Sequence, residues 1–249
     1  MTFKAKALSL VRRGKREVIL TAIGFNGGNN LFKWQLAYSR TLDKGLISKV
    51  LYFPNQDAWL EMFPGLRKLS ITSDQIRFTD RRATYMGAAQ GVDYTPQERA
   101  RFIKDVLLTS DGFKQSLERA QAFVRDDDLV INVRRGDYYN SRFEPEFGIN
   151  IVEYVRQALA KQLALGPVGR VVLVSDNVPW CVDNLTHLAP QLEFVVNEGR
   201  RDMFDDLAVL ACAKRLILAN STFSYWGAFI AQVLGTQLEN IVAPAFHQG

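Results

Sequence analysis

The sequence predicts an α/β protein built on parallel β-sheets with helices on both faces. Apolar, β-branched runs of strand length alternate with amphipathic segments of helix length, a pattern typical of parallel strands joined by crossover helices. Residues 171–174 are four apolar residues in a row, as expected for a strand covered on both faces. The chain has 249 residues, 47% of them hydrophobic and 23% charged. It therefore suits one large domain or two small ones, and disorder or a collagen-like fibre is excluded.

The first half of the chain predicts two strands and several helices. One helix has a clear beginning, because Thr95 is an N-cap, Pro96 takes the first helical position and Glu98 follows three residues after the cap. Residues 69–78 fit either a strand or a helix. The expected strands are 18–23 and 49–53, and the expected helices are 31–42, 59–63, 96 onward and 113–124.

The second half of the chain alternates more regularly. Its expected strands are 129–133, 171–174, 192–196, 216–218 and 241–242, and its expected helices are 151–165, 203–214 and 223–234. Residues 216–238 carry no charge and are long enough to span a bilayer. Their many hydroxyl and amide side chains favour a buried strand, a polar turn and a buried helix instead.

The acidic stretch Asp126–Asp128 lies between the two halves, and we interpret it as the linker between domains 1–127 and 128–249. Its spacing matches a metal-binding DxD motif. It precedes a strand, however, whereas a carboxylate that faces a ligand should follow one. We therefore expect this stretch to be solvated surface.

Cysteine and histidine are too few for a zinc site. The chain contains only Cys181, Cys212, His187 and His247, with no CxxC pair. The two cysteines are expected to be reduced thiols in a cytoplasmic protein. A catalytic Cys–His pair is disfavoured, because neither cysteine lies in a recognisable nucleophile context.

The chain begins with a basic segment. Six basic residues precede Glu17, the first acidic one, and the net charge is 31 − 26 = +5; the six are Lys4, Lys6, Arg12, Arg13, Lys15 and Arg16. A solvated segment is the slightly favoured interpretation. The alternative is peripheral contact with the anionic inner face of a membrane, to which each basic residue contributes about 1 kcal/mol. No basic motif with interleaved aromatic residues supports nucleic-acid binding.

The strongest candidate site follows the strand 129–133. Two arginines, Arg134 and Arg135, come directly after it, followed by Gly136 and Asp137. A strand covered on both faces cannot bury two unpaired guanidinium groups, so both should lie at or beyond its carboxyl end. An arginine there suits a phosphate, and a structural Arg–Asp pair with Asp137 is an equally weighted alternative. Adjacent arginines cannot both reach one phosphate easily, so one should serve the phosphate and the other a structural carboxylate.

Two further strand ends carry small polar residues. Hydroxyl and amide groups between a buried strand and a helix bind anions readily, although for Ser221 or Ser224 plain helix capping is the alternative. These residues are Ser175, Asp176 and Asn177 after one strand, and Asn220, Ser221, Thr222 and Ser224 after the other.

Several motifs together resemble the α-1,2-fucosyltransferase family. The segment 132–138, NVRRGDY, is similar to the family's His-x-Arg-Arg-Gly-Asp-Tyr, and 218–229, LANSTFSYWGAF, is similar to its Ala-Asn-Ser-Thr-Phe-Ser-Trp-Trp-Gly-Ala. Further matches in the same order are Gly28–Phe32, Ser175–Asn177 with Trp180 and Cys181, Asp202 with Met203, and more faintly 87–90 with Tyr94.

The resemblance implies a GT-B-type glycosyltransferase, with two Rossmann-like domains facing a cleft. The domain 1–127 would face the acceptor and 128–249 would bind the nucleotide sugar. The reaction would move fucose from GDP-fucose to a glycan hydroxyl with inversion, without a metal or other cofactor. Arg134 or Arg135 would neutralise the departing diphosphate. Asn132, Asp176 and Asn177 would lie towards guanine and ribose, Ser221, Thr222 and Ser224 towards the phosphates, and Asn29 towards the reacting sugar from the other domain.

The sequence departs from the family pattern at several places. Asn132 replaces the family's His, Asn30 its Gln and Trp34 its Tyr. Ala88 and Ala89 replace two aromatic residues, which predicts weakened or relocated acceptor recognition. Family members continue beyond the end of this sequence, so we expect their closing helical segment to be absent.

The general base and the exact activity stay open. Asp137 is the first choice of base, followed by Glu144 and Glu146, but Asp137 could equally only orient Arg134. Two alternatives to fucose transfer remain. One is a transferase that uses another nucleotide sugar, and the other is a sugar- or nucleotide-binding protein that has lost turnover.

Overall fold

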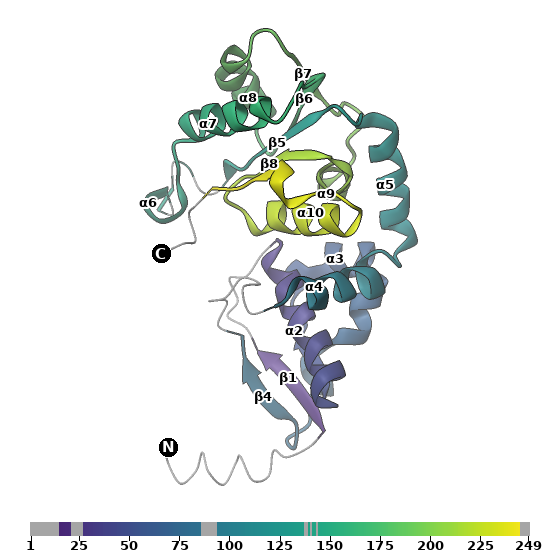
Figure 1. Cartoon of the computed structure of the whole chain (residues 1–249). Coiled ribbons are helices and arrows are strands. Elements are labelled where there is room, and N and C mark those ends of the chain that lie inside the picture. The colour runs from purple at the N-terminus through teal and green to yellow at the C-terminus, as the bar shows by residue number, and fades with distance from the viewer. Residues whose placement is uncertain are drawn as a thin grey trace. The chain divides into compact units, whose positions relative to one another are not determined.

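The computed structural model describes residues 15–20, 27–85, 94–136, 139, 141–142 and 144–244, with the side chains of 146 and 147 excepted. The chain divides into two compact units, Met1–Lys114 and Gln115–Gly249. Each unit contains its own sheet, and every strand pair is parallel (Figure 1). The predicted α/β class and the predicted parallel sheets are therefore confirmed.

The first unit contains a four-stranded sheet in the order β3-β2-β1-β4. Its strands are short and only partly buried, since in β1 only Val18 and Ile19 are fully covered. The strands are β1 Arg16–Leu20, β2 Ile47–Leu51, β3 Ser70–Ile71 and β4 Arg81–Thr84.

The helices of the first unit begin and end at residues that favour those positions. α2 packs on β2 and ends at Gly45, whose φ of 60° suits glycine. The predicted capping box before α4 is present, because Thr95 Oγ1 accepts from the Glu98 amide at 3.2 Å and the Glu98 carboxylate accepts from the Thr95 amide at 2.7 Å. The helices are α2 Asn29–Lys44, α3 Asp57–Met62 and α4 Pro96–Phe102, the last followed by a π-helical turn Ile103–Leu107. The next helix, α5 Asp111–Phe123, begins in the first unit and continues into the second.

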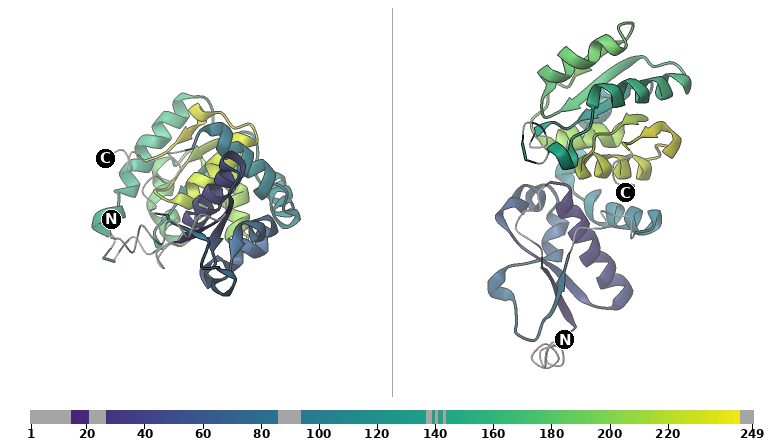
Figure 2. Two further views of the ribbon diagram at one scale, coloured as in Figure 1. Left: turned by 90° about the horizontal axis from the view of Figure 1, so that it is seen from below. Right: turned by 90° about the vertical axis from the view of Figure 1, so that its left-hand side faces the viewer.

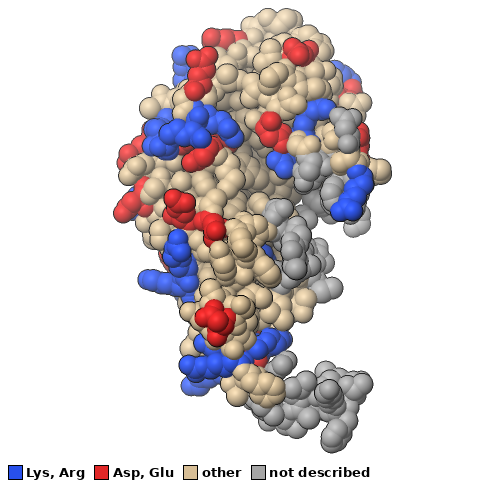
Figure 3. Space-filling view, turned by 180° about the vertical axis from the view of Figure 1, so that it is seen from behind, with Lys and Arg blue, Asp and Glu red and all other residues tan. Residues whose placement is uncertain are grey.

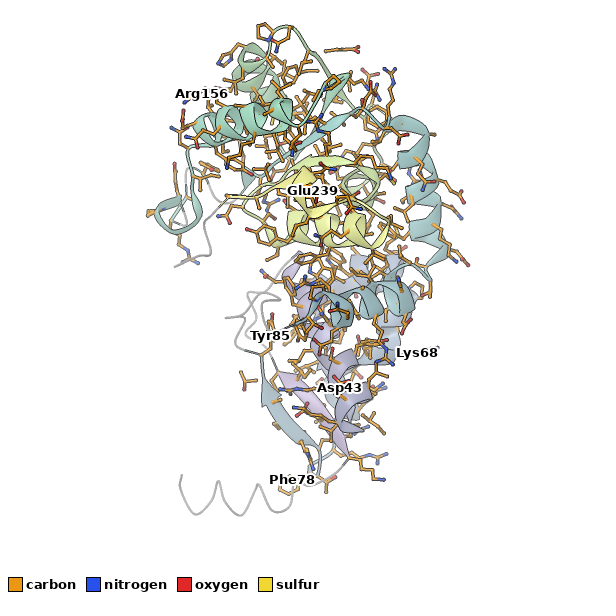
Figure 4. All side chains as sticks on the ribbon, in the orientation of Figure 1. Asp43, Lys68, Phe78, Tyr85, Arg156 and Glu239 are labelled. Carbon is orange, nitrogen blue, oxygen red and sulfur yellow. The ribbon has the colours of Figure 1, made fainter. Side chains whose placement is uncertain are left out.

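The strand β4 was not predicted. Its sequence, RRAT, has no apolar run, and the strand forms through its parallel pairing with β1. The Arg82 guanidinium also donates to the backbone carbonyls of Asp80 at 2.9 Å and Arg77 at 3.0 Å. In Figure 4, Phe78 lies before this strand and Tyr85 after it, which marks the amino and carboxyl ends of the first sheet.

The second unit contains a five-stranded parallel sheet in the order β7-β6-β5-β8-β9. All residues of β5 and β6 are buried. Leu129, Ile131 and Val133 pack with α7 and α8 in one apolar cluster, while α9 contacts β5 and β6. Figures 1 and 2 show α7 and α8 on one face of this sheet and α9 and α10 on the other. The strands are β5 Leu129–Val133, β6 Arg170–Ser175, β7 Glu193–Val196, β8 Arg215–Ile217 and β9 Ile241–Val242; the helices are α6 Glu144–Phe147, α7 Ile151–Ala164, α8 Val178–Leu185, α9 Met203–Cys212 and α10 Thr222–Val233.

The boundary between the units differs from the expected one at 127/128. It lies within α5, after Lys114, because the end of this helix is attached to the second unit. Arg119 donates to Asp205 of α9 at 3.0 Å, and the Phe123 carbonyl accepts from Arg170 of β6.

The prediction that Asp126–Asp128 is a solvated linker is wrong for its last residue. Asp128 is fully buried, and its two carboxylate oxygens accept from the Arg170 guanidinium at 2.8 and 3.0 Å. Asp128 also accepts from the Arg125 amide at 2.8 Å. A carboxylate before a strand can therefore be an internal anchor of the fold as well as part of its surface.

The uncharged segment 216–238 folds as predicted. It contains the end of β8, a polar turn and the buried helix α10. Within the residues that the structure describes, no helix has the length and apolar character needed to cross a bilayer.

Candidate active site

Three neighbouring strands of the second sheet end in polar residues. β5 lies between β6 and β8, so the residues that follow all three strands meet at one edge. The chain first extends the sheet from β5 through β6 to β7, and then crosses back to place β8 on the other side of β5. Ligands of open α/β sheets bind at such a reversal of strand order, outside the carboxyl ends.

Arg134 is held in place by a residue from the neighbouring strand end. Its guanidinium pairs with Asp176 Oδ2 at 2.9 Å, and Asp176 Oδ1 accepts from the backbone amide of Arg135 at 2.9 Å. Gly136 permits this approach, because it has φ +22° and an added Cβ would lie 2.6 Å from Asp176 Oδ2 and 2.9 Å from Arg134 Cζ. The Arg134 side chain remains 40% exposed, so it is fixed and also accessible.

Arg135 has a different environment from Arg134. Its guanidinium stacks on the ring of Trp180 at 4.2 Å and on that of Tyr139 at 4.8 Å. The Tyr139 hydroxyl in turn donates to the Ile149 carbonyl at 2.9 Å, and burial raises the pKa of Tyr139. The structure gives the structural carboxylate, that of Asp176, to Arg134, whereas Arg135 stacks on two aromatic rings. The expectation that one of the two arginines serves a phosphate stays a prediction.

Asn132 and Ser224 are bound to each other inside the unit. The Asn132 amide donates to the Val174 carbonyl at 2.9 Å, and its oxygen accepts from the Ser224 hydroxyl. Asn132 is 7% exposed and Ser224 is fully buried. This bridge joins β5 to β6 and α10, so both side chains hold the strand ends in register instead of pointing outward.

The remaining hydroxyl and amide residues cap turns and helices. Ser175 Oγ accepts from the Asn177 amide at 3.0 Å, Asn177 Oδ1 from the Trp180 amide at 3.2 Å, and Ser221 Oγ from the Phe223 amide at 3.3 Å. The capping interpretation of Ser221 is thus confirmed. Thr222 begins α10 and is half-buried.

A narrow pocket opens where β5 and β8 end. Arg134, Asn132 and Asn220 supply its polar wall, and apolar residues of α7 and of the preceding loop supply the rest. Tyr154 of α7 lines it as well, with its hydroxyl 2.8 Å from the Leu218 carbonyl; burial raises the pKa of this tyrosine. The enclosed space is about 10 Å³, the room of roughly one water molecule. A larger ligand would therefore lie across its mouth.

Several predicted residues belong to other parts of the chain or lie outside the described residues. Asp137 and the pair Ala88 and Ala89 lie outside the described residues, as does the side chain of Glu146. Glu144 is exposed at the beginning of α6, and Asn29 is the first residue of α2 in the other unit.

The sequence motifs did not indicate a role for Tyr139, Trp180 or Tyr154. Trp180 was visible only as part of the Ser175–Cys181 resemblance, and an aromatic residue gives no sequence signal that it will stack on a particular arginine. Tyr154 lies in the helix expected at 151–165, and no motif includes it.

The described residues contain no group of three or more His, Cys, Asp or Glu side chains arranged to hold a metal ion. Both cysteines are free thiols, and burial raises their pKa, that of Cys212 to about 11. A thiol with a raised pKa is a poor nucleophile at neutral pH.

The fold and the site are those of a two-unit α/β protein with an accessible arginine at a strand-order reversal. The sequence model of glycosyl transferase family 11 matches residues 95–247. The match covers more than half of the chain, and the chain belongs to this family.

Individual relatives are distant. An O-antigen biosynthesis glycosyltransferase, WbnK of Escherichia coli, is 27% identical over 101 residues, which are 40% of this chain and 33% of the relative. The galactoside α-(1,2)-fucosyltransferase 2 of Oryctolagus cuniculus is 27% identical over 139 residues, 51% of this chain and 39% of the relative. The chain thus spans between a third and two fifths of these curated relatives. Among solved structures, the NodZ α-1,6-fucosyltransferase soaked with GDP-fucose aligns with a TM-score of 0.48 and 13% identity, over 87% of this chain and 93% of that one.

Proposed function

We propose that this protein transfers fucose from GDP-fucose to a hydroxyl group of a glycan, with inversion and without a metal ion. The main support is the position of Arg134. Its guanidinium is held by Asp176 and its side chain is still 40% exposed, at the point where the strand order of the sheet reverses. The chain also belongs to glycosyl transferase family 11. The relative from Oryctolagus cuniculus is named as a galactoside α-(1,2)-fucosyltransferase, which supports fucose as the sugar that is moved.

Arg134 would act on the leaving group. In the reaction the acceptor oxygen attacks the anomeric carbon, the bond from that carbon to the diphosphate oxygen breaks, and GDP leaves with the electron pair. A permanently charged, preorganised guanidinium stabilises the charge that develops on this oxygen. A metal ion usually supplies that positive charge, so the proposal includes metal independence. The acceptor proton goes to a carboxylate, for which Asp137, Glu144 and Glu146 remain the candidates.

The donor would lie across the mouth of the narrow pocket. The polar groups around this mouth are fixed by one another, because the bridge from Asn132 to Ser224 and the pair of Arg134 with Asp176 link β5 to its neighbours. A site whose donors are already in place reorganises little when the ligand binds. This preorganisation supports ordinary donor affinity even though the acceptor side departs from the family pattern.

A thermal-shift comparison of GDP with UDP tests the proposal. At a GDP concentration about 100 times Kd the free energy of unfolding should rise by roughly 2.7 kcal/mol. EDTA should not reverse the shift, and Arg134→Ala should largely abolish it. Equal stabilisation by UDP, or strict dependence on a divalent ion, would contradict the proposal.

GDP release measured with and without acceptor separates an enzyme from a binding protein that has lost turnover. We expect slow transfer to galactose-terminated acceptors and measurable hydrolysis of the donor by water. Donor binding with neither reaction would leave only the binding function. Fast transfer to free lactose combined with weak GDP binding would reverse the prediction that the acceptor side is the one that has diverged.

We also propose that the amino end of the first sheet contacts an anionic membrane surface. Ile47 and Phe78 are exposed there by 51% and 63%, and the same end carries Lys15, Arg77 and Arg81. Figure 3 shows Lys and Arg side chains gathered over the lower part of the first unit. Exposed apolar side chains among basic residues suit the boundary between lipid headgroups and acyl chains. The acceptor would then be a bacterial surface glycan on a lipid carrier, for which the O-antigen relative gives support.

Sedimentation with vesicles tests this contact. Binding should require an anionic lipid such as phosphatidylglycerol, weaken at high salt and fall in the double variant Arg77→Glu/Phe78→Ser. The matched control is Lys161→Glu/Leu238→Ser, which changes an exposed lysine and a leucine that is 69% exposed in the second unit. Equal loss in both variants, or binding to neutral vesicles alone, would contradict it.

A further inference from the structure

The first unit contains a larger pocket that no motif of the sequence indicated. Its volume is about 290 Å³, near the lower end of the range for small-molecule sites. Tyr52 directly follows β2 and Thr72 directly follows β3, so the pocket lies where two parallel strands end. Lys68, next to one of the lining residues in the chain, marks this part of the first unit in Figure 4.

The pocket combines an aromatic ring with apolar support. Tyr52 is half-buried and lines the pocket together with Leu60 and Ile71, which are each only 4% exposed. The Tyr52 hydroxyl donates to Asp57 Oδ1 at 2.7 Å, which fixes the ring. A fixed aromatic ring offers the apolar face of a sugar a platform of defined geometry.

The charged groups of this pocket are available to a ligand. Asp57 and Arg67 both line it and both are exposed. Among the residues that the structure describes, Asp57 Oδ2 accepts no hydrogen bond, and the Arg67 guanidinium makes neither an ion pair nor a hydrogen bond. Gln75 adds an amide to the same wall. One carboxylate and one guanidinium leave the pocket without net charge.

This balance favours a neutral polyhydroxylated ligand over a phosphate. A carboxylate accepts hydrogen bonds from neighbouring hydroxyl groups, and a guanidinium donates to their oxygens in a fixed fork. A phosphate would gain from Arg67 but would be repelled by Asp57. We infer that the pocket lined by Tyr52, Asp57 and Arg67 binds a neutral sugar ring of the glycan acceptor. This inference rests on the proposed glycosyltransferase function, and it supplies an aromatic platform in a unit where Ala88 and Ala89 replace the family's aromatic residues.

The test measures acceptor kinetics and donor chemistry in the same variants. Tyr52→Ala, Asp57→Asn and Arg67→Met should each raise the acceptor KM for lactose or methyl β-galactoside by about tenfold, the loss of one hydrogen bond to a charged group or of one ring contact. Donor hydrolysis and the thermal shift with GDP should stay unchanged, because these residues and Arg134 belong to different units. Arg101→Met, which removes an exposed arginine of α4 that does not line the pocket, is the matched control and should leave KM unchanged.

Direct binding keeps this inference separate from the proposed reaction. Saturation-transfer NMR with lactose, methyl β-galactoside, glucose and mannose, without donor, should show ring contacts with at least one sugar in the wild type that Tyr52→Ala removes. Sugar binding through Tyr52 without GDP binding would refute the proposed function and leave the inference standing. Transfer with an unchanged KM in all three folded variants, binding of none of the four sugars, or preference for inorganic phosphate would overturn the inference.

Discussion

The carboxyl edges of the two sheets hold two different kinds of pocket. In the second unit the enclosed space is about 10 Å³, and Arg134, Asp176 and Asn132 are all engaged with neighbouring groups. In the first unit the pocket measures about 290 Å³, and Asp57 and Arg67 stand exposed at its wall. The polar groups at the edge of the second sheet are fixed before a ligand binds, whereas the charged groups at the edge of the first sheet remain accessible to a ligand.

The difference follows from how deeply the strands are buried. β5 and β6 are completely covered, so polar groups at their ends must satisfy one another or the backbone. β2 alternates between buried residues and exposed or partly exposed ones, and β1 buries only Val18 and Ile19, so the side chains beyond these strand ends remain in contact with solvent. A fixed edge suits stabilisation of charge in a transition state, and an open edge suits weak and variable recognition of a sugar.

The largest expected effect concerns the anchors of the two sheets. Asp128→Ala leaves the Arg170 guanidinium, now 10% exposed, without its buried partner, and should lower the free energy of unfolding by about 3–5 kcal/mol. Asp80→Ala removes the corresponding partner of Arg16, which is 24% exposed, and should cost less, about 2 kcal/mol. Urea unfolding followed by hydrogen exchange of each unit measures both. An equal loss of unfolding free energy in the two variants would show that the two sheets do not differ in how strongly they depend on these ion pairs.

Next in size is the loss of Arg134. Arg134→Ala should lower kcat/KM while the protein stays folded. The loss should correspond to about 3 kcal/mol of transition-state stabilisation. Arg135→Ala should mainly lower Tm, because it removes the stacking on Trp180 and Tyr139. Steady-state GDP release and thermal unfolding of both variants separate the two roles. Normal turnover in both folded variants would mean that the site is elsewhere.

Sequence reasoning predicted the second unit better than the first for a physical reason. A strand buried on both faces is mostly apolar, so the sequence predicted β5 at Leu129–Val133 with the bounds that the structure gives. The partly buried edge strand β9, Ile241–Val242, was also predicted with its bounds. β3 has two residues and β4 is charged. Such strands form through pairing with their neighbours, which a local pattern does not contain.

The site was predicted by position but not by contact. The positions of the strand ends predicted that Arg134, Asp176 and Ser221 would lie at one edge of the second sheet. They did not predict that Asn132 would accept a hydrogen bond from Ser224 or that Arg135 would stack on Trp180. These contacts join residues more than forty positions apart. The pocket around Tyr52 is different, because its lining residues all lie within 52–75, but no motif there indicated that they would surround a pocket.

A smaller effect is expected where the fixed edge depends on a glycine. Gly136→Ala places a Cβ against Asp176 and Arg134 at a φ of +22°. Because both charged side chains must then move, kcat/KM should fall by a factor that corresponds to about 1–3 kcal/mol of transition-state stabilisation. Gly166→Ala is the control, since its φ is +144° and nothing lies within 4 Å of the added Cβ. It should lose stability by strain without a change in GDP binding. Equal loss of activity in both variants would show that strain alone explains Gly136.

The smallest expected effect is an opposite pH response of the two units. Burial lowers the pKa of Lys33 in α2 to about 8, and burial raises the pKa of Asp206 in α9 to about 6 in spite of its ion pair with Arg200. A lysine with a lowered pKa contributes stability above its unfolded value of 10.5, and that contribution is lost as the pH falls through 8. An aspartate with a raised pKa contributes stability below its unfolded value of 3.8, and that contribution is lost as the pH rises through 6.

At pH 7 both charges are therefore unfavourable, so Lys33→Met and Asp206→Asn should each raise the free energy of unfolding by about 1–2 kcal/mol. The gain from Lys33→Met should disappear above about pH 10 and that from Asp206→Asn below about pH 4, and hydrogen exchange should assign the first to residues before 114 and the second to residues after it. Gains that do not depend on pH would mean that packing, and not the buried charge, sets the difference between these two helices.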